Sequence, residues 1–358
     1  RLSDGPPETL RQLPFYLPTV PLALAPLAAG GAHTAAVLWS ALQVITLAYA
    51  LARLRAWLRT DATDPGAGAG AFWLLILISL PAIYEATKFN QVTWFTLALL
   101  IAGQAALERG KDAAAGCWLA AAAVLKLLPA LLFVWLLFER RWRAAATMAV
   151  AIVAFMVTPP VIAFGPDRAW QYHLQWWSFN VREGAAERWL STEHWGDNSE
   201  HFIDRRNQSI AAICGRVFWK DHAHRVAWQP LNLTQRQVLR LANAISAALG
   251  VLLLAASWPG RGERRPADAP DIPDTPNVST ANSRAWPARG RFALYLIALQ
   301  VLAPLARMYY LAWTLPALAI LAARSASIAP VRTRTAARLG VLLWCVGMLA
   351  WPVREMRE

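Results

Sequence analysis

Long apolar stretches alternate with short clusters of arginine and lysine along most of this chain. Several of the stretches approach the roughly 20 apolar residues that an α-helix needs to cross a bilayer. This alternation predicts an all-α, polytopic membrane protein with about 8–10 membrane helices. Single crossings are expected at residues 33–52, 71–87, 92–107, 144–163, 237–257 and 339–352.

Two further apolar stretches are too short for the crossings that their flanks require. Residues 113–138 begin and end among charges, yet about 26 residues at about 1.5 Å each cannot cross twice. They predict a re-entrant hairpin of two short helices with its apex at VLKLLP, where Pro129 breaks the hydrogen-bond ladder. Residues 292–323 repeat this pattern with APLARMYY (303–310) at the apex. The proline-rich opening segment, residues 14–31, predicts a broken or re-entrant piece near the outer face.

The basic clusters orient the chain, because cytoplasmic loops of membrane proteins are enriched in lysine and arginine. We expect a cytoplasmic location for RLRAWLR (53–59), ERGKD (108–112), ERRWR (139–143), GRGERR (260–265), RGR (289–291), Arg324, RTR (332–334) and Arg338. The Trp-rich stretch at about 164–235 then becomes an external loop. The chain divides into a transmembrane core at 1–257, a disordered cytoplasmic linker at 258–291, and C-terminal transmembrane segments at 292–358.

Composition supports this class and argues against two others. Hydrophobic residues make up 57% of the 358 residues and charged residues 16%, with a mean hydropathy of +0.33. The net charge of +13 comes from clusters between apolar stretches and not from a separate basic domain, so we expect no nucleic-acid partner. Cys117, Cys214 and Cys345 are scattered, and the histidines match no zinc spacing, so neither a disulfide framework nor a metal site is predicted.

Four polar features share the outer face in this topology, and their convergence predicts a functional site there. They are the turn TKFNQ (87–91), Lys126, the 164–235 loop and the apex LARMYY (305–310). Lys126 lies within an apolar stretch, where a lysine costs roughly 2.5–3.5 kcal/mol on insertion scales, so it is a candidate for contacting a phosphate. The alternative is a side chain that extends to a nearby interface.

The other candidate residues also have plainer alternatives. Arg307 could contact a phosphate, with Tyr309 and Tyr310 stacking on or hydrogen-bonding to a substrate, or all three could belong to an interfacial belt. Asn90 and Gln91 offer the donors and acceptors that sugar hydroxyls require. Lys88 could join them, or it could anchor the interface or pair with Glu85 one helical turn away.

The external loop adds a polar cluster and a run of tryptophans. Arg206, Asn207 and Gln208 could bind a phosphate or a sugar, and Ser209 could instead cap the helix that follows. The tryptophans could stack on carbohydrate, or they could lie on the membrane in amphipathic helices.

The order and spacing of these segments resemble glycosyltransferase family 87. The carriers are FNQV (89–92), an apolar helix with a short basic loop, Ala115-Gly116, Leu-Lys-x-x-Pro at 125–129, and RRWR (140–143). The opening segment resembles the family's Tyr-Pro-Pro segment, RRNQSIAAICGRV (205–217) its Asn-Gln-Ser segment, and LAPLARMYYLAW (302–313) its late segment.

The resemblance implies a GT-C-like fold and an enzyme of the plasma (inner) membrane whose active site faces the exterior. Its reaction would transfer a hexose, mannose, from a polyprenyl-phosphate sugar to a glycolipid or glycan acceptor, without a cofactor. Lys126 and Arg307 would contact the donor phosphate, and Lys88, Asn90, Gln91 and Asn207 would lie on the sugar or pyrophosphate side.

Two positions depart from the family's pattern. The late segment has Met308-Tyr309-Tyr310 where family members often carry paired histidines. The family's catalytic Asp precedes the Tyr-Pro-Pro segment, but Asp4 does not stand in its Asp-Tyr context. We therefore expect the catalytic base upstream of Arg1, with Asp4 and Glu85 as weak candidates within the chain.

Two other functions remain open on the sequence alone. A transporter or flippase for a lipid-linked or small polar substrate could use the same polar residues as a path, although transporters often carry two matching halves. A non-catalytic membrane scaffold would need none of them.

Overall fold

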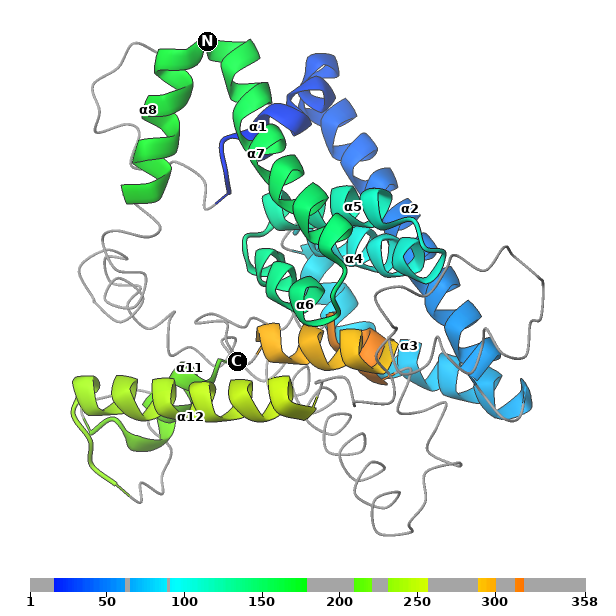
Figure 1. The fold of residues 1–358 in the computed structure, drawn as a ribbon, viewed down its shortest axis with the longest axis vertical. Helices are drawn as coiled ribbons and strands as arrows, with labels where there is room; N and C mark the ends of the chain where they lie inside the picture. The colour runs from blue at the N-terminus through cyan, green and yellow to red at the C-terminus, as the bar shows by residue number, and fades with distance from the viewer. Residues whose placement is uncertain are drawn as a thin grey trace.

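The structure is a computed structural model that describes residues 16–61, 65–88, 91–178, 209–220, 231–256, 289–300 and 313–318. Within these ranges the chain is almost entirely helical, with no strand beyond one isolated bridge between Trp219 and Leu233, so the all-α prediction is confirmed there. The helices are α1 (Thr19–Leu24), the 3-10 turn η2 (Ala25–Gly30), α2 (Gly31–Asp61), α3 (Pro65–Lys88), α4 (Thr93–Glu108), α5 (Asp112–Leu125), η3 (Leu128–Leu131), α6 (Leu132–Phe138), α7 (Trp142–Phe164), α8 (Pro166–Trp177), α11 (Ile210–Phe218) and α12 (Gln235–Ala256). Residues 289–300 form a further helix (Figure 1).

Two helical stretches of the described chain, Thr19–Arg59 and Trp142–Phe164, are long and apolar enough to cross a membrane. Both expose large apolar side chains outward: Val44 is 65% exposed on α2, and Val150 and Ile162 are 70% and 80% exposed on α7. A continuous apolar surface of this kind is costly in water and suits a lipid environment. The other crossings that the sequence predicts stay predictions.

The broken segments follow the prolines, as the sequence predicts. The opening segment passes from α1 through η2, with Pro26 near its start, before α2 begins at Gly31 with a φ of 84°. The stretch 113–138 is divided into α5 and α6, and the break lies at Lys126 and Leu127, ahead of Pro129 in η3. The second predicted apex, 303–310, lies outside the described residues.

Helices α4, α5 and α7 form the centre of the core, and two glycines let them approach closely. A Cβ on Gly116 of α5 would lie 2.5 Å from the backbone oxygen of Ala144 on α7. A Cβ on Gly103 of α4 would lie 2.7 Å from a Leu119 side-chain carbon on α5. Small residues at helix interfaces are typical of membrane bundles, where packing has to replace the hydrophobic drive between helices.

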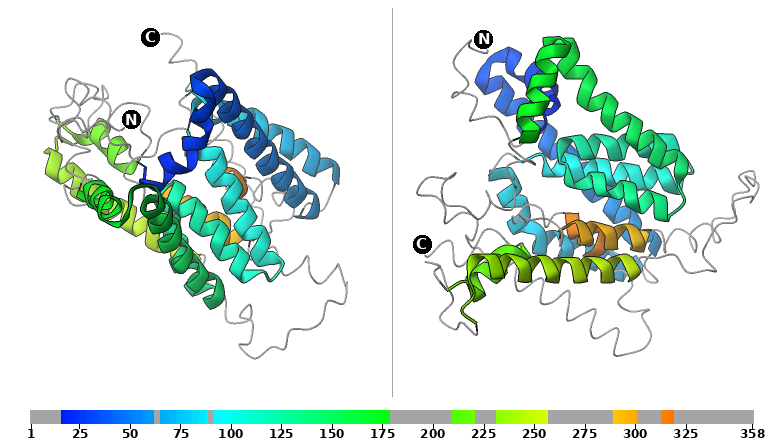
Figure 2. Two further views of the ribbon diagram at one scale, coloured as in Figure 1. Left: turned by 90° about the horizontal axis from the view of Figure 1, so that it is seen from above. Right: turned by 60° about the vertical axis from the view of Figure 1, so that its left-hand side comes forward.

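Three of the basic clusters that the sequence assigns to one side, ERGKD (108–112), ERRWR (139–143) and RGR (289–291), meet at one end of the core. Arg141, at the start of α7, donates to Asp112 at the start of α5 over 3.2 Å. Arg289 and Arg291 of helix 289–300 pair with carboxylates at the ends of α4 and α6. Residues 289–291, which we expected to close the linker, therefore belong to a packed helix that lies beneath α6 (Figures 1 and 2).

Candidate functional site

Lys126 lies at the break between α5 and η3, at the end of the core opposite the basic turns. It caps the C-terminus of α5 with an extended backbone (φ −143°, ψ 123°), and its N–H donates to the carbonyl of Ala122 over 3.0 Å. Pro129, three residues on, prevents α5 from continuing as a regular helix. The break therefore turns the lysine out of the helical ladder and into the core, where it is only 8% exposed.

Gln91 brings Lys126 together with two segments that are distant in sequence. Its Oε1 accepts a hydrogen bond from the Tyr16 hydroxyl over 3.1 Å and a long one from Lys126 Nζ over 3.5 Å. The N–H of Gln91 donates to the carbonyl of Ala86 over 3.0 Å, which fixes this turn against the end of α3. One amide oxygen thus joins the opening segment, the α3–α4 turn and the α5 break in a polar cluster of Tyr16, Gln91 and Lys126.

Burial sets the chemistry of the lysine. Lys126 lies outside both long apolar helices, and desolvation lowers the pKa of its ammonium from 10.5 to about 7. An anion placed beside this group would favour the charged form and be held by it in return. In this structure the Lys126 side chain is buried and contacts Gln91.

The neighbouring candidates on α3 take two different positions. Glu85 is buried, at 4% exposed, within the last turns of α3. Lys88 is exposed, and its ammonium lies over the ring of Tyr84 at 5.5 Å from the centroid. Asn90 lies outside the described residues. Of the predicted turn TKFNQ, the structure thus places Gln91 in the cluster and leaves Lys88 at the surface.

A second polar junction lies close to this cluster, and the sequence reasoning missed it. Pro160 has no N–H, so it cannot serve the carbonyl of Met156 four residues earlier in α7. That carbonyl instead accepts from Thr19 Oγ1 over 3.1 Å, and His173 Nε2 lies 3.0 Å from it. The Pro159-Pro160 pair inside an apolar helix was the available signal, because it predicts carbonyls that need other partners.

The junction also holds α8 against the opening segment. Figures 1 and 2 show α8 beside the upper part of α7. Trp176 of α8 packs in one buried cluster with Leu17 and Val124. Leu17 adjoins Tyr16, and Val124 lies two residues before Lys126. On its outer side α8 exposes Trp170, Leu174 and Trp177, the pattern expected of an amphipathic helix that contacts lipid.

The cap predicted at Ser209 is confirmed. Its hydroxyl accepts from the N–H of Ala212 over 3.2 Å at the start of α11. Several other predicted site residues lie outside the described residues, namely Asp4, Arg206, Asn207, Gln208, Arg307, Tyr309 and Tyr310. In the part of the chain that the structure describes, no group of three His, Cys, Asp or Glu residues is placed to hold a metal ion.

Comparison with known proteins defines the class to which this helical chain with a buried cationic cluster belongs. The model of glycosyltransferase family 87 matches residues 14–269, well over half of the chain. The chain belongs to glycosyltransferase family 87, as the order of its motifs predicts. No curated protein and no solved structure matches it. The match includes Tyr16, Gln91 and Lys126 and ends before helix 289–300.

Proposed function

We propose that this glycosyltransferase moves a hexose, mannose, from a polyprenyl-phosphate donor to a lipid-linked or glycan acceptor at the external face of the plasma membrane. The observation that carries the proposal is the buried Lys126 ammonium, held by Gln91 within the matched region of a glycosyltransferase. A lysine that is desolvated in this way is a point charge suited to a phosphate. Family membership favours transfer over transport.

The position of the cluster supports the external face. Arg141, Arg289 and Arg291 make ion pairs at one end of α4, α5 and α6, and Lys126 lies at the other end of α5 and before α6. Arginine-rich turns mark the cytoplasmic side of a membrane protein. The opposite end, which holds the cluster, then faces outward, where a donor lipid in the outer leaflet would present its phosphate and sugar.

The reaction makes two demands on the protein. The acceptor hydroxyl attacks the anomeric carbon and loses its proton to a carboxylate, while the bond between that carbon and the phosphate oxygen breaks. The electron pair of that bond leaves with the polyprenyl phosphate, whose negative charge increases. A cation beside the departing phosphate lowers the energy of this transition state. Lys126 supplies the cation in our proposal.

The remaining polar residues would orient the donor and acceptor. Gln91 would direct the ammonium and offer its amide N–H groups to the phosphate or sugar. Lys88 and Asn90 adjoin it in sequence, and Arg307 with Tyr309 and Tyr310 would complete the phosphate and sugar contacts, as would Arg206, Asn207 and Gln208. Glu85, buried six residues before Gln91, stays one of the two weak in-chain candidates for the base, and Asp4 is the other.

Transfer from radiolabelled polyprenyl-phosphate mannose in membranes tests the proposal, with Lys126→Ala as the test and Lys111→Ala as its control. Both lysines flank α5, but Lys111 is an exposed residue at the basic end. We expect Lys126→Ala to lose transfer by at least tenfold and Lys111→Ala to retain it. Equal transfer by both variants and wild type would refute the role of Lys126. Transfer from a nucleotide sugar, with none from the polyprenyl donor, would refute the donor class.

A further inference from the structure

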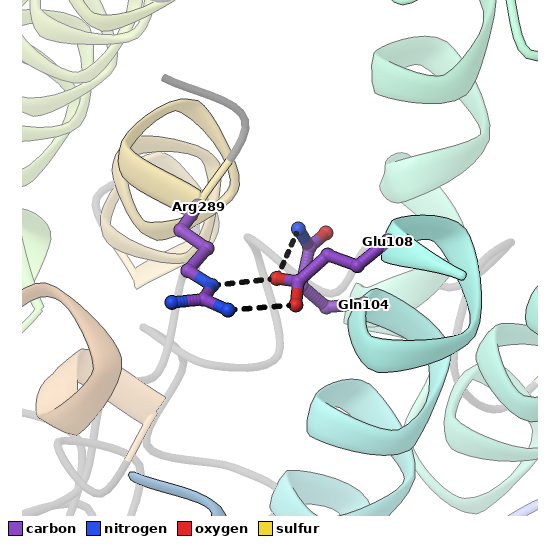
Figure 3. A network of polar contacts seen from close by, with 3 residues as sticks. All are labelled: Gln104, Glu108 and Arg289. Carbon is purple, nitrogen blue, oxygen red and sulfur yellow. Dashed lines mark hydrogen bonds and ion pairs between the residues drawn. The ribbon is translucent and has the colours of Figure 1, made fainter. Parts of the chain in front are cut away.

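Helix 289–300 is bound to the core by two arginines, Arg289 and Arg291. Arg289 donates to Glu108 through Nε at 2.8 Å and Nη2 at 3.0 Å, and Gln104 donates to the same carboxylate over 3.2 Å (Figure 3). Arg291 donates to Glu139 through Nε at 2.6 Å and Nη2 at 3.1 Å. Both pairs are two-point contacts of the kind that fixes geometry as well as charge.

The two carboxylates that the arginines bind are unfavourably placed on their own helices. Glu108 is the last residue of α4, and Glu139 caps the C-terminus of α6, where the helix dipole repels a carboxylate. Pairing with Arg289 and Arg291 therefore offsets two poor local placements at once.

Apolar packing ties the same helix to α6 and α2. Phe292 and Tyr295 lie against Trp135 of α6, with ring centroids 5.3 and 5.9 Å away. The guanidinium of Arg289 lies 5.3 Å from the ring centre of Trp57 on α2. The inner face, which also includes Leu296, is buried in the main hydrophobic core. The helix thus contacts three core helices although it lies outside the range matched by the family.

Each of the two glutamates lies at the C-terminal end of a helical stretch that begins close to the cluster. Helix α4 begins two residues after Gln91 and reaches Glu108 after 16 residues, or about 24 Å. The η3–α6 stretch begins two residues after Lys126 and leads to Glu139. Gln91 therefore lies just before α4, and Lys126 lies just before the η3–α6 stretch. A clamp that joins Glu108 to Glu139 at the other ends of these stretches constrains how Gln91 and Lys126 meet.

We propose that Arg289 and Arg291 are positioning residues that clamp α4 to α6 and thereby hold Gln91 and Lys126 in contact at the opposite end of the core. The importance of that contact for catalysis rests on the proposed function, but the clamp itself does not. It links a helix beyond the family-matched region to the site through two rigid helices.

The test is a distance between spin labels on either side of the cluster. Thr87→Cys and Leu127→Cys place labels at exposed positions near Gln91 and Lys126, in a background without the three native cysteines. We expect one narrow distance distribution with the clamp intact. Arg291→Glu and Glu139→Arg should each broaden or shift it, and the Arg291→Glu/Glu139→Arg double variant should restore it. Arg143→Glu, a reversal at an exposed arginine of the same end, should leave it unchanged.

Each outcome decides the proposal. Single reversals that keep the native distribution, or a double reversal that fails to restore it, would overturn the clamp. If the single reversals do not fold, Arg291→Lys decides, because it keeps the charge but loses the two-point contact; a distribution identical to wild type would then overturn the clamp. The measurement needs no substrate, so a protein with an intact clamp and no transfer activity would contradict the proposed function alone.

Discussion

The close approach of α5 to α7 makes Gly116→Ala the most direct test of the core packing. A Cβ on Gly116 would lie 2.5 Å from the Ala144 oxygen and 2.8 Å from the Met148 nitrogen, about 1 Å inside ordinary contact for the first of them. Both atoms belong to the backbone of α7, so no side-chain rotation can relieve the overlap. The helices would have to separate along their shared interface.

The expected magnitude comes from two opposing terms. Replacing glycine by alanine inside a helix gains about 1 kcal/mol in intrinsic propensity. Overpacking a close-packed interior costs about 1–3 kcal/mol, and a clash with backbone belongs at the upper end of that range. The free energy of unfolding should therefore fall by about 1–2 kcal/mol. In a thermal unfolding scan this corresponds to a loss of about 2–4 °C for each kcal/mol.

Two other helical glycines provide matched controls for the same chemical change. A Cβ on Gly103 would lie 2.7 and 2.8 Å from two Leu119 side-chain carbons, which can move, and at an ordinary contact distance of 3.6 Å from the Ala115 backbone oxygen. Gly103→Ala should therefore cost less than Gly116→Ala. Gly70 on α3 has nothing within 4 Å, so Gly70→Ala should be neutral or stabilising. Melting temperatures of the three variants in one detergent test the order. A Gly116→Ala protein as stable as Gly70→Ala would refute the close packing of α5 on α7.

Three further predictions concern single groups. Ser209→Ala should lower the free energy of unfolding by about 1 kcal/mol, whereas Ser209→Asn should retain most of it, because the cap at Ala212 needs a side-chain oxygen; equal losses in both variants would contradict the cap. Burial lowers the pKa of Lys126 to about 7, so the unfolded chain binds more protons than the folded chain between pH 7 and 10.5. The free energy of unfolding of the ligand-free protein should therefore rise with pH across that window. Lys126→Met should reduce this slope in a pH series of melting curves. Tyr16→Phe should cost about 0.5–1.5 kcal/mol by removing one neutral hydrogen bond to Gln91, while Tyr49→Phe, at an exposed tyrosine of α2, should cost almost nothing.

The sequence predicts those features of the fold that depend on local physics. Pro129 and the prolines of the opening segment mark where helices break, and the structure breaks them there. The arginine-rich turns identify one end of the core because they share a physical preference, and the ion pairs at Asp112, Glu108 and Glu139 bring them together. Lys126 stands out because a lysine in an apolar stretch is expensive wherever it lies.

What the sequence does not predict depends on contacts between distant segments. Tyr16 lies 75 residues from Gln91, and nothing in its immediate neighbours distinguishes it from an interfacial tyrosine. Thr19 and His173 meet only because Pro160 leaves a carbonyl available on a third segment. The arginines at 289 and 291 look like one more basic cluster, and only the positions of Glu108 and Glu139 show that they are paired.

The contacts at the Met156 carbonyl of α7 can be broken without unwinding any helix. In an ordinary helix that oxygen would be bound by its own backbone, and releasing it would require the helix to unravel. Here Thr19 and His173 bind it with side chains, and rotation about a single side-chain bond is enough to detach either one. Each such tie is worth about 1 kcal/mol, so thermal motion can release them often. The opening segment and α8 are therefore held to this carbonyl by side-chain hydrogen bonds that can break while the helical hydrogen bonds of α7 stay in place.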